Sequence, residues 1–169
     1  MARSSVGIDG GLLKSRDGIF KALVVILSLI AWILNLSSNY WIWHTPRTSE
    51  LVFVSFALGF TFVTELFSYV VYFFQLYSLP LVRRAPWKIL ELLYAVICAV
   101  FNFVGMCIAA ALSGRFTAFN IPNLHGLTVA TAICSAALVL LFLLYGFLLL
   151  RGQEPRSVPP SRSETHVST

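Results

Sequence analysis

The stretch from Leu51 to Leu79 limits the possible folds of this chain more than any other part of the sequence. It is almost wholly apolar, rich in Phe and Tyr, and longer than the roughly 20 residues that an α-helix needs to cross a bilayer. Near its middle lies Glu65, whose side chain can carry a charge. A carboxyl group at that depth is costly unless it is protonated or hydrogen-bonded. We therefore expect Glu65 to face protein rather than lipid, and to be neutral.

Polar side chains of this stretch fall on one face of the predicted helix, because they are spaced three or four residues apart. They are Thr61, Glu65, Ser68, Tyr72 and Gln75. A later apolar run carries a second stripe with the same spacing, made of Glu91, Tyr94, Cys98, Asn102, Gly105 and Ala109. Counting residues inward from the helix ends places Glu65 and Asn102 within about one turn of the same depth. The sequence therefore predicts an intramembrane polar cluster in which Glu65 is hydrogen-bonded by some of Asn102, Tyr94 and Ser28.

Composition agrees with a membrane protein, because 58% of the residues are hydrophobic and only 11% are charged, against about 25% charged in soluble domains. We expect an all-α integral membrane protein, a four-helix transmembrane bundle with spans at about 19–41, 51–79, 88–113 and 124–150. Residues 1–18 would form an N-terminal segment, Gly114–Asn123 a loop, and residues 151–169 a disordered tail, since that tail is polar and rich in Pro and Ser.

The distribution of Lys and Arg predicts the orientation of the spans. Ten of these residues flank the two ends of the chain and the connection between the second and third spans, whereas Arg47 and Arg115 lie in the other two connections. Positive residues collect on the cytoplasmic side, so both termini are expected to be cytoplasmic. Arg83, Arg84 and Lys88, in and just after the middle connection, are predicted to contact anionic lipid headgroups.

Two further features concern helix packing near the cytoplasmic border and at the opposite end. Glu91 lies one turn after Lys88 and at the depth of Lys21, so an interfacial ion pair explains it. Small residues are concentrated in the outer halves of the third and fourth spans, where they let helices approach closely in lipid. The predicted packing residues are Gly105, Ala109, Gly126 and Ala130.

A search for reactive groups yields little. The histidines, His44, His125 and His166, have no metal-ligand spacing, and no phosphate-binding loop or catalytic triad is evident. All three cysteines lie inside apolar runs, which favours packing over disulfide or redox roles. We expect no catalytic residue, no metal and no cofactor. Glu65 leaves two possibilities open, a structural hydrogen bond or a proton or ion path.

The layout resembles the MARVEL family, in particular its short-loop branch of proteins related to MAL, plasmolipin and the chemokine-like factors. The resemblance covers about residues 14–151. It rests on four spans with short connections, on the basic segment Lys14–Lys21 that leads into the first helix, and on the sequence Trp87–Tyr94 that opens the third. It implies a non-enzymatic role in membrane organisation, through vesicle trafficking or the clustering of lipids and cargo.

Three functional hypotheses follow from these observations. The first is a tetraspan organiser in the plasma membrane or in endomembrane vesicles, with membrane lipids, other membrane proteins or itself as partners and no nucleic acid. The second is a small proton- or ion-conducting protein that uses Glu65. The third is an accessory subunit that binds another membrane protein through its small-residue faces.

Overall fold

The computed structural model describes residues 15–41, 49–74, 87–119 and 121–151. These residues form α1 (Arg16–Trp41), α2 (Ser49–Phe73), α3 (Trp87–Ala118) and α4 (Pro122–Leu150), and none of them forms a strand. All four helices are long and apolar enough to cross a membrane. The prediction of an all-α protein with four membrane spans is confirmed.

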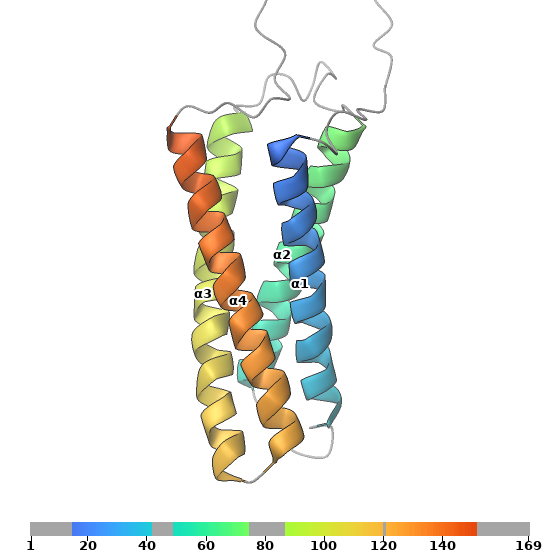
Figure 1. The fold of residues 1–169 in the computed structure, drawn as a ribbon, viewed down its shortest axis with the longest axis vertical. Coiled ribbons are helices and arrows are strands. Elements are labelled where there is room, and N and C mark those ends of the chain that lie inside the picture. The colour runs from blue at the N-terminus through green and yellow to red at the C-terminus, as the bar shows by residue number, and fades with distance from the viewer. Residues whose placement is uncertain (1–14, 42–48, 75–86, 120, 152–169) are drawn as a thin grey trace, which may run out of the picture.

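The helices form an antiparallel bundle in which each helix packs against its neighbours in the order α1, α2, α3, α4 and back to α1 (Figure 1). Of the four neighbouring pairs, α3 and α4 have the most extensive packing, and α2 and α3 have the least. We call the end that holds Arg16, Phe73, Trp87 and Leu150 the terminal end, and the opposite end the turn end. The first turn of α1 and the last turn of α4 therefore lie at the same end of the bundle.

Two helix boundaries differ from the predicted spans. Helix α2 ends at Phe73, and the last residues of its predicted span, 75–79, lie outside the described part of the chain. Helix α3 continues through Gly114 to Ala118, so the expectation of a loop from Gly114 to Asn123 is wrong. Glycine costs a helix only about 1 kcal/mol, and continuing the helix satisfies backbone groups that lipid cannot.

The turn between α3 and α4 is correspondingly tight. The amide of Ile121 donates to the carbonyl oxygen of Phe116 at 3.1 Å, which closes the chain into the next helix. Pro122 then occupies the first turn of α4, a position where proline's missing N–H costs no helical hydrogen bond.

The bundle encloses an apolar core, which includes Val24, Leu58, Leu138 and Phe142, together with a set of polar side chains. Its outer surface carries many large apolar side chains, among them Phe56, Phe67, Phe103 and Leu140, each more than half exposed. The buried polar side chains come from all four helices and from Ser15, just before α1, and they are Ser15, Lys21, Ser28, Asn35, Ser38, Thr61, Glu65, Glu91, Asn102, Thr128, Thr131 and Ser135. This arrangement is expected in hydrocarbon, because polar groups are costly against lipid and helix association there depends on packing and interhelical hydrogen bonds.

Candidate functional site

A buried ion pair lies at the centre of the terminal half of the bundle. The Lys21 ammonium is 3.3 Å from Oε1 of Glu91, and the two side chains are 2% and 7% exposed. The Tyr72 hydroxyl donates to Oε1 of the same carboxylate, and the Tyr145 hydroxyl donates to Oε2 at 2.9 Å. Lys21 also donates to the Ser68 hydroxyl oxygen at 2.9 Å. All four helices contribute to this group of side chains, which we call the Glu91 cluster (Lys21, Ser68, Tyr72, Glu91 and Tyr145).

Aromatic rings shield the charge of Lys21 from the surrounding hydrocarbon. Its ammonium lies 4.9 Å from the ring centroid of Tyr72 and 5.3 Å from that of Tyr145. Phe20 stacks on the Tyr145 ring, with 5.1 Å between centroids. A charge pair out of water is tolerated only when additional hydrogen bonds and favourable contacts satisfy both partners. The Glu91 cluster meets that condition.

The structure changes the interpretation of Glu91. The sequence suggested an interfacial pair with Lys21 or Lys88, whereas the pair with Lys21 is buried among the four helices. The side chain of Lys88 lies outside the described residues. Sequence reasoning missed the role of Tyr145 altogether. A signal existed, since Tyr145 is the one residue with a hydroxyl between Leu138 and Leu150.

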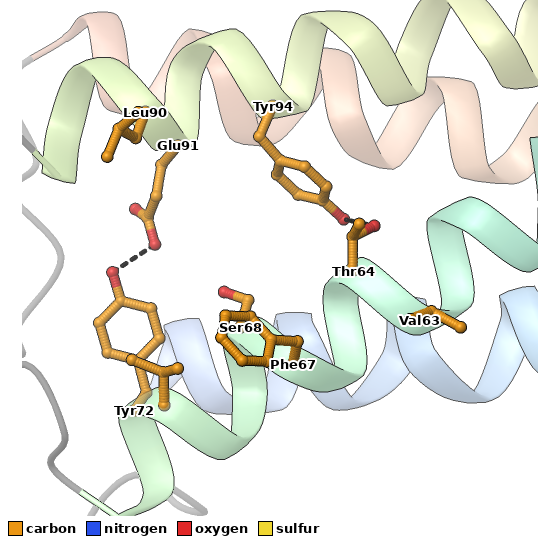
Figure 2. Close-up of a pocket in the computed structure, with 9 residues that line it drawn as sticks. Val63, Thr64, Phe67, Ser68, Tyr72, Leu90, Glu91 and Tyr94 are labelled. Carbon is orange, nitrogen blue, oxygen red and sulfur yellow. Dashed lines mark hydrogen bonds between the residues drawn. The ribbon is translucent and has the colours of Figure 1, made fainter.

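Glu65 lies one layer deeper, 1% exposed. The Tyr94 hydroxyl is its hydrogen-bonding partner, and Lys21 is near enough to act on the Glu65 carboxyl electrostatically. Tyr94 is also 3.5 Å from the Thr64 hydroxyl, one residue before Glu65 on α2 (Figure 2).

The other two predicted partners of Glu65 bind elsewhere. Asn102 donates through its amide to the Thr61 hydroxyl at 2.8 Å and to the carbonyl oxygen of Cys98 at 2.8 Å. Ser28 is fully buried, and its hydroxyl donates back to the carbonyl oxygen of Val25 in its own helix at 3.0 Å. Short hydroxyl side chains often form such local bonds.

Three buried polar atoms have no hydrogen-bond partner within the described part of the chain. They are Oε2 of Glu65, Oδ1 of Asn102 and Oγ of Ser135. They come from α2, α3 and α4, and all three residues are 1% exposed. Buried polar groups are usually paired, so each of these atoms can still take part in a hydrogen bond, and only the Glu65 carboxyl can also exchange a proton.

A cleft of about 490 Å³ lies between α2 and α3 in the terminal half of the bundle. These two helices have the least extensive packing of the four neighbouring pairs. The lining of the cleft is almost wholly apolar, with Val63, Phe67 and Leu90 at the exposed rim. Figure 2 shows hydroxyl and carboxyl groups of Thr64, Ser68, Tyr72, Glu91 and Tyr94 facing the space between the two helices. The Glu91 cluster thus forms part of the cleft wall.

The predicted small-residue contacts are only partly in place. Gly105 and Ala109 are buried, but a Cβ placed on Gly105 would meet Ala57 of α2 at 4.0 Å, not a residue of α4. Gly126 is exposed with open space beside it, and Ala130 is half-buried. The close contact between α3 and α4 therefore does not depend on Gly126.

The remaining predicted groups add no reactive site. Within the described ranges no three His, Cys, Asp or Glu side chains gather in a way that could hold a metal ion. Cys98, Cys107 and Cys134 are free thiols. Arg83 and Arg84 lie outside the described residues, so their proposed headgroup contacts stay a prediction.

Comparison with known proteins gives one match. A family model described as MARVEL, a membrane-associating domain, matches residues 12–150. No curated protein and no solved structure matches the chain.

Proposed function

The chain belongs to the MARVEL family of membrane-associating domains, and from that premise we propose that it is a non-enzymatic membrane organiser that clusters lipids and cargo during vesicle trafficking. The short connection between α3 and α4 supports placing it with the MAL, plasmolipin and chemokine-like-factor branch. Its site of action would be the plasma membrane or endomembrane vesicles.

The observation that carries this proposal is an apolar outer surface around a bundle in which the buried charges of Lys21 and Glu91 pair with each other. In the Glu91 cluster, Lys21 and Glu91 form an ion pair, and two tyrosine hydroxyls donate hydrogen bonds to Glu91. The surface of the spans presents large apolar side chains. A bundle of this kind acts on its surroundings chiefly through lipid contacts and contacts with other membrane spans.

Basic residues beside the spans support the same proposal. Arg83, Arg84 and Lys88 lie in the sequence that joins α2 to α3 and enters α3. Each Lys or Arg near an anionic membrane surface adds about 1 kcal/mol of attraction. We propose that these three residues favour a leaflet rich in anionic lipid.

The test combines localisation of the tagged protein with proximity labelling in cells. We expect enrichment in a defined vesicle or plasma-membrane domain, with trafficking proteins among the labelled neighbours. Glu65→Gln should retain this distribution, because an amide preserves the volume and hydrogen-bonding ability of the neutral carboxyl. A uniform distribution of the folded wild-type protein would contradict the proposal, and one stoichiometric neighbour would favour an accessory subunit.

Proton or ion conduction is a second candidate, favoured by the unpaired atoms of Glu65, Asn102 and Ser135 in the bundle interior. Purified protein in liposomes should then produce a flux above that of empty vesicles. Glu65→Gln should abolish the flux, since the amide cannot exchange a proton. Flux equal to that of empty vesicles would eliminate this candidate.

A further inference from the structure

Asn102 of α3 and Ser135 of α4 lie at the same depth inside the bundle. Glu91 of α3 accepts a hydrogen bond from Tyr145 of α4, and the two helices run antiparallel (Figure 1). Asn102 is eleven residues after Glu91, and Ser135 is ten residues before Tyr145. Because each residue advances a helix by about 1.5 Å, Asn102 and Ser135 face each other at one level, and both are 1% exposed.

The side-chain amide of Asn102 has a fixed orientation. Its Nδ2 donates to the Thr61 hydroxyl oxygen and to the carbonyl oxygen of Cys98, both at 2.8 Å. The Thr61 hydroxyl in turn donates its proton to the carbonyl oxygen of Ala57 at 2.9 Å. If the amide were rotated by half a turn, its oxygen would face two acceptors. Oδ1 of Asn102 is therefore a buried acceptor without a donor among the described residues.

The hydroxyl of Ser135 differs from its neighbours on α4. Thr128 and Thr131 each donate to the carbonyl oxygen four residues earlier, at 2.9 Å, as short hydroxyl side chains often do in helices. Oγ of Ser135 makes no such bond and has no other partner in the described part of the chain. It is thus available both to donate and to accept.

Ser28 adds a further acceptor from α1. Lys21 donates to Ser68, and Ser28 lies seven residues after Lys21 while Thr61 lies seven residues before Ser68. Ser28 is therefore at the depth of Thr61, and it is fully buried. Its hydroxyl proton is donated to the carbonyl oxygen of Val25 at 3.0 Å, which leaves the oxygen as an acceptor. The layer formed by Ser28, Thr61, Asn102 and Ser135 has more acceptors than donors.

A small neutral donor suits this layer better than a cation does. A cation would have only neutral amide and hydroxyl oxygens as ligands here. The acid closest in sequence, Glu65, lies one turn after Thr61 and is bonded to Tyr94. An ion removed from water without a counter-charge is very costly. Water carries no charge, has two hydrogens to donate, and forms about three hydrogen bonds when it is buried in a protein.

We propose that a single water molecule binds inside the bundle and bridges Oδ1 of Asn102 and Oγ of Ser135, with the Ser28 hydroxyl oxygen as its third partner. The water links α3, α4 and α1 by hydrogen bonds, and the bond between Asn102 and Thr61 extends the link to α2. This site goes beyond the proposed function and does not rest on it.

The experiment detects the water by NMR on the full chain in nanodiscs, deuterated at all carbon-bound positions. The side-chain amide protons of Asn102 are the reporters, because both are hydrogen-bonded within the bundle. We expect a cross-relaxation peak between these protons and water, with the sign that a long-lived bound molecule produces. Glu65→Gln should leave the peak unchanged, since Glu65 is not a partner of this water.

Two variants of Ser135 test the site itself. Ser135→Val replaces the hydroxyl by methyl groups and should remove the water peak at Asn102. Ala136→Val is the matched control, because it adds similar bulk at the next, half-buried residue of the same helix, and the peak should remain. Folding is checked for every variant by thermal unfolding.

Thermal unfolding of Ser135→Ala gives an independent readout through its sign. Loss of a bridged hydroxyl should lower the unfolding temperature by about 2–4 °C, the shift that 1 kcal/mol produces in a chain of this size. Loss of a buried hydroxyl without a partner would raise it, because an unsatisfied polar group is itself destabilising. Alanine is also the better helix former, so a decrease cannot come from helix propensity.

Four results would overturn the proposal. They are the absence of a water peak at Asn102 in the folded wild type, a peak that persists in folded Ser135→Val, a higher unfolding temperature in Ser135→Ala, and a wild-type unfolding temperature that falls when sodium is replaced by choline. The last result would identify a bound cation in place of water.

Discussion

At the residue scale, Glu91 shows the condition under which a charge is kept inside a membrane bundle. Its carboxylate has a cation, Lys21, and two phenolic donors, Tyr72 and Tyr145. Attraction between the charges, strengthened by the low dielectric constant of the interior, is offset by the cost of removing both from water. The stability of the folded protein should therefore fall strongly when one partner of the pair is removed, and much less when both partners are made neutral.

Replacing Lys21 by Met should destabilise the protein by about 3–5 kcal/mol, the usual cost of leaving one charge of a buried pair unmatched. Thermal unfolding in detergent measures the loss. The double variant Lys21→Met with Glu91→Gln should recover most of it, because the amide oxygen accepts from one tyrosine hydroxyl and the amide N–H donates to the hydroxyl oxygen of the other.

The exposed pair between Arg115 and Glu50 provides the control. These side chains are 3.1 Å apart but 60% and 37% exposed, and pairs of this kind contribute about 0–1 kcal/mol. Arg115→Met should therefore change the unfolding temperature little. Equal losses in Lys21→Met and Arg115→Met would show that the Glu91 cluster is hydrated.

At the element scale, glycine sets how closely helices approach at one position and is unimportant at another. A Cβ on Gly59 of α2 would lie 3.2 Å from the indole ring of Trp32 in α1, closer than normal packing allows. Gly126 at the start of α4 has nothing within 4 Å of the same position. The two glycines therefore differ in packing although both lie in apolar helices.

Gly59→Leu should destabilise the protein by about 1–3 kcal/mol, since overpacking forces side chains and backbone to shift. Gly126→Leu should leave stability near that of the wild type, because its side chain extends away from the bundle. Unfolding in detergent, followed by Trp fluorescence, measures both. A larger effect at Gly126 would contradict this packing of α1 and α2.

At the scale of the whole molecule, the antiparallel order of four helices brings the start of α1 and the end of α4 to the same end. We therefore expect the chain to enter α1 and to leave α4 on one side of the membrane. The charge distribution of the sequence, ten Lys and Arg on that side against two on the other, predicts that the side is the cytoplasm.

Epitope tags at the two termini test this orientation. After selective permeabilisation of the plasma membrane, antibodies should reach both tags while a lumenal marker stays protected. A tag inserted at Arg47, in the connection between α1 and α2, should stay protected too. Protection of one terminal tag and exposure of the other would contradict the four-span topology.

The sequence alone determined the class of fold and the inward faces of the helices. Long apolar runs predict spans because hydrocarbon cannot satisfy an open backbone. The spacing of Thr61 and Glu65 on α2, and of Glu91 and Asn102 on α3, likewise places them on inward stripes, since helical periodicity is local. The family resemblance came from the same local features and is confirmed by the match over residues 12–150.

Only the tertiary structure decided which residues of different helices meet. The depth and rotation of one helix against another depend on tilt and side-chain packing, and neither is encoded in the periodicity of a single helix. For this reason Asn102 pairs with Thr61 rather than Glu65, and Lys21 and Tyr145 converge on Glu91 inside the bundle. The cleft between α2 and α3 is likewise a property of how two helices diverge, so no stretch of sequence could reveal it.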